Sequence, residues 1–507
     1  MKMVKTLLLG SAAGLVAIAG AQAADLPVKA KPVEYVKVCS LYGAGFYYIP
    51  GTDTCVKIGG YVRAQYYYGN GSQVAAGVMF GATNGEQSRS SPADAVLRTR
   101  AVMTMDSRTQ TEWGTLRTYY LLGFTDDNGS TSLYATRGFI QFAGFTFGKA
   151  QSFYDIFSNP AVSYFGFASS DTGDAGTNLA AYTAQLGNGV SATIAAEGPR
   201  TVGIFNTSTQ LSNAITLGNN LANDSVNVRF PDVVANIRVD QAWGSFQVMG
   251  ALHDASAAYN FQEIGALGLP AGAGNSYYTV PTSVPRTLQG NGDDALGWAV
   301  GVGARVKTDF ISRGDSFQFQ VNYTEGATRY AVTTQPSAGS PLRFSGNSIG
   351  AGWFTDGIYT DGGSVELVKV LGINASYEHV WTPALKTSVY GAYIDVDYGN
   401  AANTAVCNYL SAGTTNNLPL AAGSPCDMDF SFWQLGSRTQ WNVRPDFYMG
   451  VDVLYTRLNT ALEGANVIAG VNGPGSAVGS QSPRTGNIFG DQDALAVTFR
   501  VHRDIVP

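Results

Sequence analysis

Histidine, charge and long apolar runs are scarce in this sequence of 507 residues, and each shortage excludes a class of protein. The three histidines, His253, His379 and His502, are too scattered to form an acid–base centre. Asp, Glu, Lys and Arg make up only 13% of the chain, and the net charge of −6 leaves no basic stripe for nucleic acid. After residue 23 no run of about 18 apolar residues occurs, which excludes a transmembrane helix.

Cysteine is also rare, with four residues at positions 39, 55, 407 and 426. No Cys-x-x-Cys pair or Cys/His cluster exists, so we expect neither a metal site nor another cofactor. In an exported chain, local pairing of Cys39 with Cys55 and of Cys407 with Cys426 would close two small loops. Each closure would contribute about 3 kcal/mol in the chain-entropy model. The other two connectivities remain open at this point.

The N-terminus predicts export. Residues 1–23 combine Lys2 and Lys5 with a short apolar run and the small-residue site Ala21-Gln22-Ala23, as a secretory signal peptide does. The alternative is a retained membrane anchor, for which the apolar run is short. We therefore divide the chain into a signal peptide (1–23), an N-terminal periplasmic segment with a small cysteine-bounded loop (24–54) and a barrel domain (55–507).

What the chain has in abundance is glycine, with 61 residues, together with 27 tyrosines and 25 phenylalanines. This composition, without long helical periodicity, is typical of an all-β protein. Many segments alternate strictly between apolar and polar residues, as strands with one apolar face do. In 315–328, for example, Phe317 and Phe319 alternate with Gln318 and Gln320.

About sixteen such segments can be counted, and short turns alternate strictly with long connections between them. An even number of strands of about ten residues, with short turns at one end and long loops at the other, is typical of an antiparallel transmembrane β-barrel in an outer membrane. The turns would be periplasmic and the long loops extracellular. A soluble sandwich also alternates, but it does not sort its loops by length so regularly. The expected strands are 56–68, 93–109, 115–125, 132–143, 145–155, 178–187, 189–197, 232–243, 245–256, 295–308, 315–328, 365–381, 385–398, 428–442, 446–459 and 493–504.

A sixteen-stranded barrel is wide enough for an aqueous channel, so its polar face must line the lumen and its apolar face must meet lipid. On the polar face the first four strands and the last strand carry a basic wall. The alternative for any one of these arginines is that it merely solvates the lumen or pairs with a neighbouring carboxylate. The expected pore-lining residues are Arg63, Arg98, Arg100, Arg117, Arg137 and Arg500.

The long connection after the fifth strand carries Asp155, Asp171 and Asp174. If this third loop folds into the barrel, its acids face the basic wall and form a constriction whose fixed charges select ions. An ordinary solvated loop is the alternative.

These patterns predict a passive channel for ions and small hydrophilic solutes, without a catalytic step. Two other functions remain open: an outer-membrane barrel enzyme of the lipase or protease type, and a soluble exported β-sandwich that binds ligands. The run Gly346-Asn347-Ser348-Ile349-Gly350 matches a hydrolase nucleophile motif, with His379 downstream. That motif requires a strand before it and a helix after it, whereas here it lies in a long Ser/Gly-rich loop.

Three stretches carry a resemblance to a known family: LLLGSAAGLVA with AQAAD, then VEYVKVCSLYGAGFYYIPGTDTCVKIGGYVR, then TEWGTLRTY. They resemble the general porins of alphaproteobacteria. The resemblance implies a trimeric, sixteen-stranded diffusion porin with an inward-folded third loop. It also implies a disulfide between Cys39 and Cys55, and attachment of the mature N-terminus, which would begin at Ala24, to peptidoglycan.

Overall fold

The computed structural model describes most of the chain after residue 38. The expected signal peptide and residues 24–38 lie outside the described residues. The described ranges are 39–69, 95–156, 161–168, 170, 176–207, 225, 229–257, 293–332, 342–345, 348–359, 363–411, 420–466 and 488–506.

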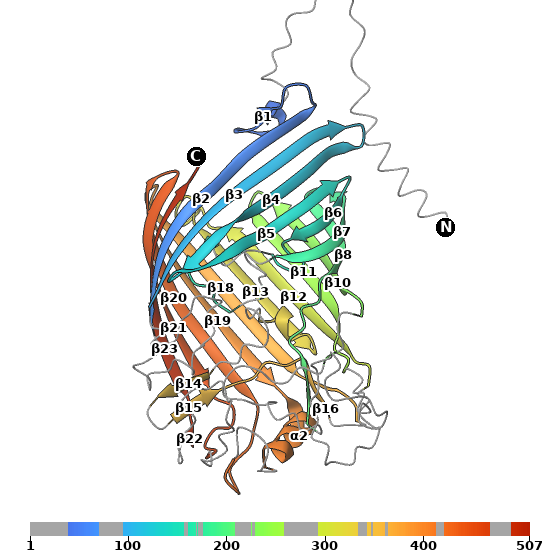
Figure 1. Cartoon of the computed structure of the whole chain (residues 1–507), viewed down its shortest axis with the longest axis vertical. Helices are drawn as coiled ribbons and strands as arrows, with labels where there is room; N and C mark the ends of the chain where they lie inside the picture. The colour runs from blue at the N-terminus through green and yellow to red at the C-terminus, as the bar shows by residue number, and fades with distance from the viewer. Residues whose placement is uncertain are drawn as a thin grey trace, which may run out of the picture.

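One large antiparallel sheet dominates these residues (Figure 1). It has seventeen strands, of which the two-residue β1 (Tyr47–Tyr48) pairs only with β2. The other sixteen close into a barrel, as the sequence pattern predicts. They are β2 (Thr54–Gly69), β3 (Ala95–Thr111), β4 (Gly114–Asp127), β5 (Ser130–Phe142), β6 (Phe145–Ala150), β7 (Thr177–Gly187), β8 (Val190–Glu197), β10 (Asp232–Gln241), β11 (Gly244–Asp254), β12 (Leu296–Lys307), β13 (Ser316–Glu325), β18 (Lys369–Thr382), β19 (Leu385–Asp397), β20 (Phe430–Arg444), β21 (Phe447–Asn459) and β23 (Gln492–Asp504).

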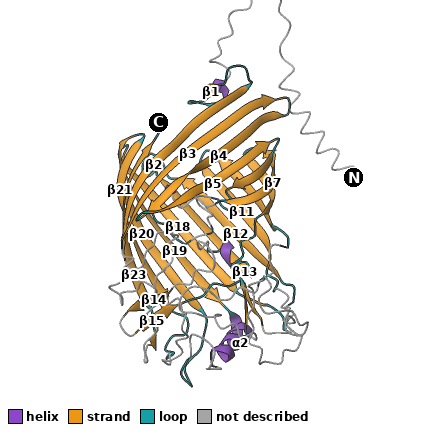
Figure 2. Cartoon of the chain, viewed as in Figure 1, coloured by secondary structure: helices purple, strands orange, loops and turns teal. Residues whose placement is uncertain are grey.

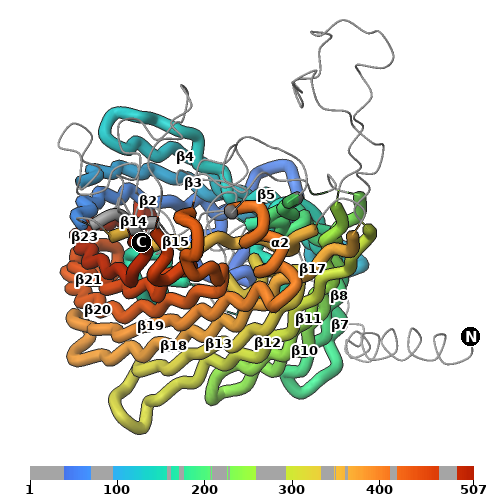
Figure 3. The backbone as a smooth tube through the Cα atoms, turned by 90° about the horizontal axis from the view of Figure 1, so that it is seen from below, coloured from blue at the N-terminus to red at the C-terminus, as the bar shows by residue number. Residues whose placement is uncertain are grey.

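The first and last of these strands close the ring. β2 pairs with β23 from Tyr61 opposite Asp504 to Gly69 opposite Ala496. From Gly60 back to Thr54, β2 pairs with β3 and with the short β1 but no longer with β23, so β2, β3 and β4 project past the rim (Figure 1). Viewed along the barrel, the strands form a flattened ring (Figure 3).

Connections at the two ends of the barrel differ in length. At one end, called here the turn end, most links are two residues long, such as 112–113 and 383–384. The other end, called here the loop end, carries the long connections. The expected strict alternation is wrong at one place, because β4 and β5 are joined at the loop end by Asn128 and Gly129 alone. Their φ angles of 51° and 90° fit the tight hairpin turn that an Asn-Gly pair favours, and this turn extends both strands.

The outer face of the barrel is apolar, as expected for contact with lipid. On β13, Phe317 and Tyr323 are exposed, whereas Gln318, Gln320 and Asn322 face inward and are buried. The same alternation runs through the wall, where Val62, Leu122 and Val248 are also exposed. Among the described residues no helix is long and apolar enough to cross a membrane.

The inner face departs from the prediction near the loop end of β19, β20 and β21. There Tyr390, Ile394, Phe432 and Leu454 point inward and belong to a large buried apolar cluster. The physical reason is that long connections fold over this part of the lumen and pack on it with Trp353, among others. The polar face therefore lines the lumen only in part.

The covering segments contain their own secondary structure (Figure 2). One small sheet combines β9 (Ile204–Asn206), β16 (Gly357–Tyr359) and β17 (Glu366–Leu367), and another combines β14 (Leu342–Ser345), β15 (Ser348–Ala351) and β22 (Ile488–Phe489). The helix α2 (Gly399–Ser411) lies in a stretch that the sequence analysis treats as loop. Its buried residues Ala402, Val406 and Leu410 recur every four positions, which is the helical period.

Both local disulfides are present: Cys39 pairs with Cys55, and Cys407 pairs with Cys426. The first holds the turn η1 (Cys39–Tyr42) beside the projecting wall. There Tyr42 donates to Gln110 Oε1 at 3.4 Å, and Lys57 Nζ donates to the carbonyl of Ala44 at 3.2 Å. Gln110 and Lys57 belong to the same strand faces as Arg100 and Arg63, so the stapled segment lies on the lumen side of the projection, at the turn end.

Candidate functional site in the barrel lumen

Loop 3, the connection 151–176 between β6 and β7, enters the barrel. The strand expected at 145–155 ends at Ala150, and the chain then turns inward. The carbonyl of Phe153 accepts hydrogen bonds from Asn236 Nδ2 at 2.5 Å and from Gln247 Nε2 at 3.2 Å. These amides lie on the inner faces of β10 and β11, so the first turn of loop 3 is fixed to the inner wall.

The middle of loop 3 reaches the wall formed by β19, β20, β21 and β23. The carboxylate of Asp452 on β21 accepts from the backbone N–H of Tyr164 at 2.5 Å and from Ser163 Oγ at 3.0 Å. Arg438 Nη1 donates to the carbonyl of Ala161 at 2.9 Å, and Arg500 Nη2 donates to that of Tyr164 at 3.1 Å. Loop 3 is thus held across the lumen by a carboxylate and two guanidinium groups.

Tyr164 is buried at this crossing. Its phenol donates to Gln440 Oε1 at 3.1 Å, and the guanidinium of Arg500 lies 4.1 Å from its ring centroid. Burial raises the pKa of the Tyr164 phenol, although the neighbouring Arg438 acts in the opposite sense. The phenol therefore stays neutral, and the charged groups at this point are the arginines and Asp452.

The five predicted arginines of the first four strands lie on one side of the wall, each with identifiable contacts. Arg98 forms a double hydrogen bond with Asp127, at 2.6 and 2.7 Å. Arg117 binds Asp106 in the same way, at 2.9 and 3.1 Å. For these two residues the expected alternative of a carboxylate partner on the neighbouring strand is present.

The remaining three have other partners. Arg100 donates to Thr125 Oγ1 at 2.9 Å and lies 3.8 Å from the ring centroid of Tyr134. Arg137 Nη1 donates to the carbonyl of Thr136 at 2.8 Å. Arg63 Nε donates to His502 Nδ1 at 3.3 Å.

Of the three predicted acids of loop 3, only Asp155 lies within the described residues. Asp155 Oδ1 accepts from Arg200 Nη2 at 3.0 Å, and Arg200 lies on the connection after β8. Asp171 and Asp174 lie outside the described residues. Arg200, Arg438 and Asp452 are functional candidates that the sequence analysis does not single out. Strand alternation indicates the inward faces of Arg438 and Asp452, but it does not indicate what they bind.

In the part of the chain that the structure describes, Ser348 and His379 lie at opposite ends of the barrel, so they do not combine as a hydrolase motif would require. Ser348 lies on β15 at the loop end, where its Oγ accepts from Gln492 Nε2 at 2.9 Å. His379 contacts Asp315 next to a short turn at the opposite end of the barrel. Among the described residues, no group of three or more His, Cys, Asp or Glu side chains could hold a metal ion.

Comparison with known families agrees with this geometry. The family model described as the porin subfamily matches residues 25–496, which is most of the chain. The chain belongs to this porin subfamily. This porin is accordingly an outer-membrane protein.

Curated relatives of this porin come from Brucella. Porin Omp2b of Brucella suis biovar 1 (strain 1330) and porin Omp2b of Brucella canis are each 34% identical to it over 262 residues. That stretch covers 48% of this porin and 64% of each relative. The match thus spans less than two thirds of the length of these relatives.

Among solved structures, the outer membrane channel DcaP of Acinetobacter baumannii has a similar fold. Its TM-score against this porin is 0.54 at 12% identity, and the match covers 90% of this porin and 99% of DcaP. At this identity the likeness concerns the fold alone.

Proposed function

We propose that this porin forms a water-filled passive channel for ions and small hydrophilic solutes across the outer membrane. One observation carries the proposal: loop 3 crosses a lumen whose wall bears guanidinium, carboxylate and amide groups, inside a barrel with an apolar exterior. Sixteen strands leave room for water, and a charged loop inside them narrows the passage.

The direct test is single-channel conductance of the purified protein in a planar bilayer. We expect stepwise insertion events, each with a stable ohmic conductance that scales with the salt concentration. A barrel that inserts but carries no current would contradict a general diffusion channel.

The channel acts without chemistry in this proposal. The barrel enzyme remains as a competing function to be tested. Hydrolysis of phospholipid or peptide that is lost in a Ser348→Ala variant would favour the enzyme.

We further propose that the basic wall and loop 3 form the constriction, with the predicted arginines and with Asp155, Asp171 and Asp174 as its charged groups. Support comes from the contact of Arg500 with Tyr164 of loop 3 and from the shared face of the other arginines. Ion selectivity of single-charge variants tests the assignment.

Two partners complete the proposal. A homotrimer is supported by the resemblance to general porins, and light scattering of the detergent complex measures it: a protomer mass would contradict it. Attachment of Ala24 to peptidoglycan is supported by the same resemblance. Digestion of purified cell wall with lysozyme should then release the protein with a covalently bound muropeptide, detectable by mass spectrometry.

A further inference from the structure

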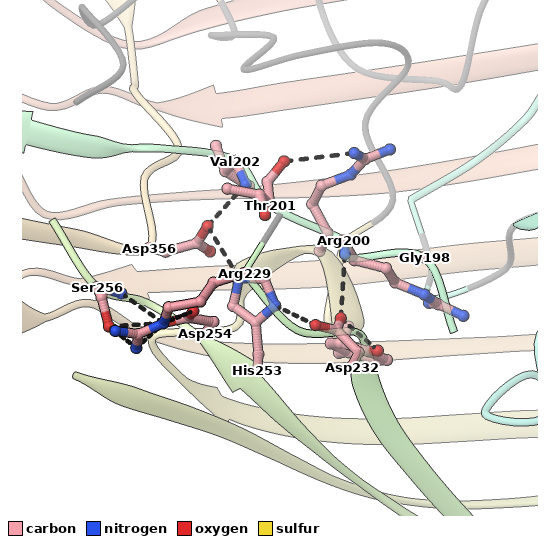
Figure 4. Close-up of polar contacts among 12 residues, drawn as sticks. Gly198, Arg200, Thr201, Val202, Arg229, Asp232, His253, Asp254, Ser256 and Asp356 are labelled. Atoms are coloured by element: carbon pink, nitrogen blue, oxygen red, sulfur yellow. Dashed lines mark hydrogen bonds and ion pairs between the residues drawn. The ribbon is translucent and has the colours of Figure 1, made fainter. Parts of the chain in front are cut away.

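A buried histidine lies among the long connections, away from the basic wall. His253 is on the inner face of β11 and is fully buried. Its Nδ1 lies 2.7 Å from Asp232 Oδ1, and its Nε2 lies 3.7 Å from Asp356 Oδ2 (Figure 4). Asp232 begins β10, whereas Asp356 lies on the connection between β15 and β16. The ring thus stands between two buried carboxylates from distant parts of the chain.

Two buried carboxylates beside one ring favour its charged form. A neutral imidazole has one N–H and one lone pair, so one of the two carboxylates would face a lone pair. With both nitrogens protonated, the Asp232 contact is a hydrogen bond and the Asp356 contact is a longer ion pair. Because an unpaired buried charge is strongly destabilising, His253 and its two carboxylates depend on one another.

Asp356 fastens two connections at once. Its Oδ2 accepts from the backbone N–H of Val202 at 2.7 Å and of Gly203 at 3.2 Å, and its Oδ1 accepts from that of Thr328 at 3.0 Å. Val202 and Gly203 follow β8, and Thr328 follows β13. The three donors direct the carboxylate toward His253, so the imidazolium fixes the place where these connections meet.

Asp232 leads from the same ring to loop 3. Its Oδ2 accepts from the phenol of Tyr330 at 2.8 Å and from the backbone N–H of Arg200 at 3.0 Å. The side chain of Arg200 then donates to Asp155 Oδ1 and to the carbonyl of Ser170, both at 3.0 Å. Asp155 and Ser170 lie at the two flanks of loop 3. A continuous series of contacts therefore joins His253 to loop 3.

We propose that His253 is a positioning residue for the passage: its buried positive charge holds Asp232 and Asp356, and through Arg200 it fixes loop 3 across the lumen. The inference rests on the proposed channel function. In this role His253 keeps the width of the constriction constant. It does not contact a permeating solute.

The test compares single-channel records of the native protein with those of His253→Gln. Glutamine keeps one donor but removes the charge, so we expect a severalfold rise in open-channel current noise with frequent steps to other conductance levels. His379→Gln is the matched control. His379 also contacts an aspartate, Asp315 at 2.8 Å, but it lies at the turn end and should leave the record unchanged.

Charge compensation separates positioning from simple packing. Asp356→Asn alone should also raise the noise, because an amide cannot accept from all three backbone N–H groups. The double variant His253→Gln with Asp356→Asn removes one charge of each sign, so we expect it to be less noisy than the two single effects added together. Noise at or above that sum would overturn the proposal. So would a folded His253→Gln protein with a native record.

A second variant tests the proposal if His253→Gln does not fold. If His253→Gln shows no folded barrel on an unheated gel, Asp155→Asn weakens the contact between Arg200 and loop 3 at the far end of the series, and we expect the same noise from it if its barrel folds. A quiet Asp155→Asn channel would then overturn the proposal. If the native protein itself carries no current, the channel function fails, and this outcome is distinct from a quiet variant in a conducting background.

Discussion

Arg98 and Arg117 each form an ion pair with a carboxylate on the neighbouring strand. Arg100 instead contacts the hydroxyl of Thr125 and the ring of Tyr134. A guanidinium neutralised at 2.6 Å contributes little net field at a distance, but its removal still leaves the carboxylate behind. The local charge therefore falls by one unit for every arginine replaced, with or without a partner.

Replacing Arg98, Arg100 and Arg117 by serine should therefore move the reversal potential in a salt gradient toward cation selectivity. The variant removes three positive charges from the proposed constriction. Asp127 loses its contact with Arg98, whereas Asp106 keeps Arg108 at 2.9 Å. The control is Arg313→Ser, in the turn between β12 and β13, with no expected shift. An unchanged reversal potential in the triple variant would place these arginines outside the ion path.

The hydrogen bonds of Asp315 at the turn end should make the stability of the barrel depend on pH. It accepts from the phenol of Tyr377 at 2.5 Å, the backbone N–H of Val380 at 2.7 Å and His379 Nδ1 at 2.8 Å. Burial alone would raise the pKa of Asp315, but these hydrogen bonds outweigh it and hold the pKa below its usual value of about 3.9.

The contribution of Asp315 to stability is therefore complete above pH of about 4 and is lost as the pH falls through the lower folded-state pKa. We expect the temperature of the heat-dependent gel shift to fall in that acid range for the native protein. In Asp315→Asn it should already be lower at neutral pH and change less on acidification. Parallel pH curves for the two proteins would contradict this reading of the turn.

At the scale of elements, one carboxylate makes two of the hydrogen bonds that hold the middle of loop 3. Asp452 accepts from Ser163 Oγ, Tyr164 N–H and the phenol of Tyr390, at 3.0, 2.5 and 2.6 Å. Asp452→Ala leaves these donors unpaired and should lower the free energy of unfolding by about 2 to 3 kcal/mol. It should also release the middle of loop 3.

The measurement is again single-channel conductance, which we expect to rise because a released loop no longer narrows the lumen. Asp395→Ala on β19 serves as the control, since its recorded contact is with the partly exposed Tyr393 on the same strand. A lower conductance in Asp452→Ala than in the native protein would mean that the anchored loop keeps the passage open.

The strands were predictable because alternation is a local pattern. The side of the sheet on which a residue lies can be inferred from the polarity of the two or three residues beside it. The sixteen strands and the general apolar exterior follow from that period. The anchor of loop 3 could not be predicted in the same way, because Ser163 and Asp452 are 289 positions apart. The apolar inner face at Ile394 and Phe432 was not predicted for a related reason. The long connections that pack there show no regular alternation of apolar and polar residues.

At the scale of the whole molecule, the stapled segment and the barrel are separable. Ring closure begins at Tyr61, beyond the stretch that the Cys39–Cys55 disulfide holds. A Cys39→Ser/Cys55→Ser variant should therefore keep the heat-dependent gel shift of a closed barrel. It should lose the roughly 3 kcal/mol of loop-closure entropy at the staple alone.

Limited trypsin digestion provides the local readout. The side chain of Lys57 is already exposed, so we expect the end of β2 around it to fray without the staple and to be cleaved faster than in the native protein. The matched control is Cys407→Ser/Cys426→Ser, which opens a loop at the opposite end and should leave Lys57 as protected as in the native protein. Absence of any folded band in the first variant would mean that the staple is needed for closure.

The pairing of β2 with β23 also sets the order of biogenesis. Arg63 on the first strand bonds His502 on the last across 439 positions, so the ring stays open until nearly the whole chain has been delivered. Until then both outer strands present unpaired backbone groups, which lipid does not tolerate. A nascent chain cut short before residue 492 lacks the closing strand altogether. Insertion and completion of the polypeptide are therefore coupled, and truncated chains should be held in the periplasm and degraded there.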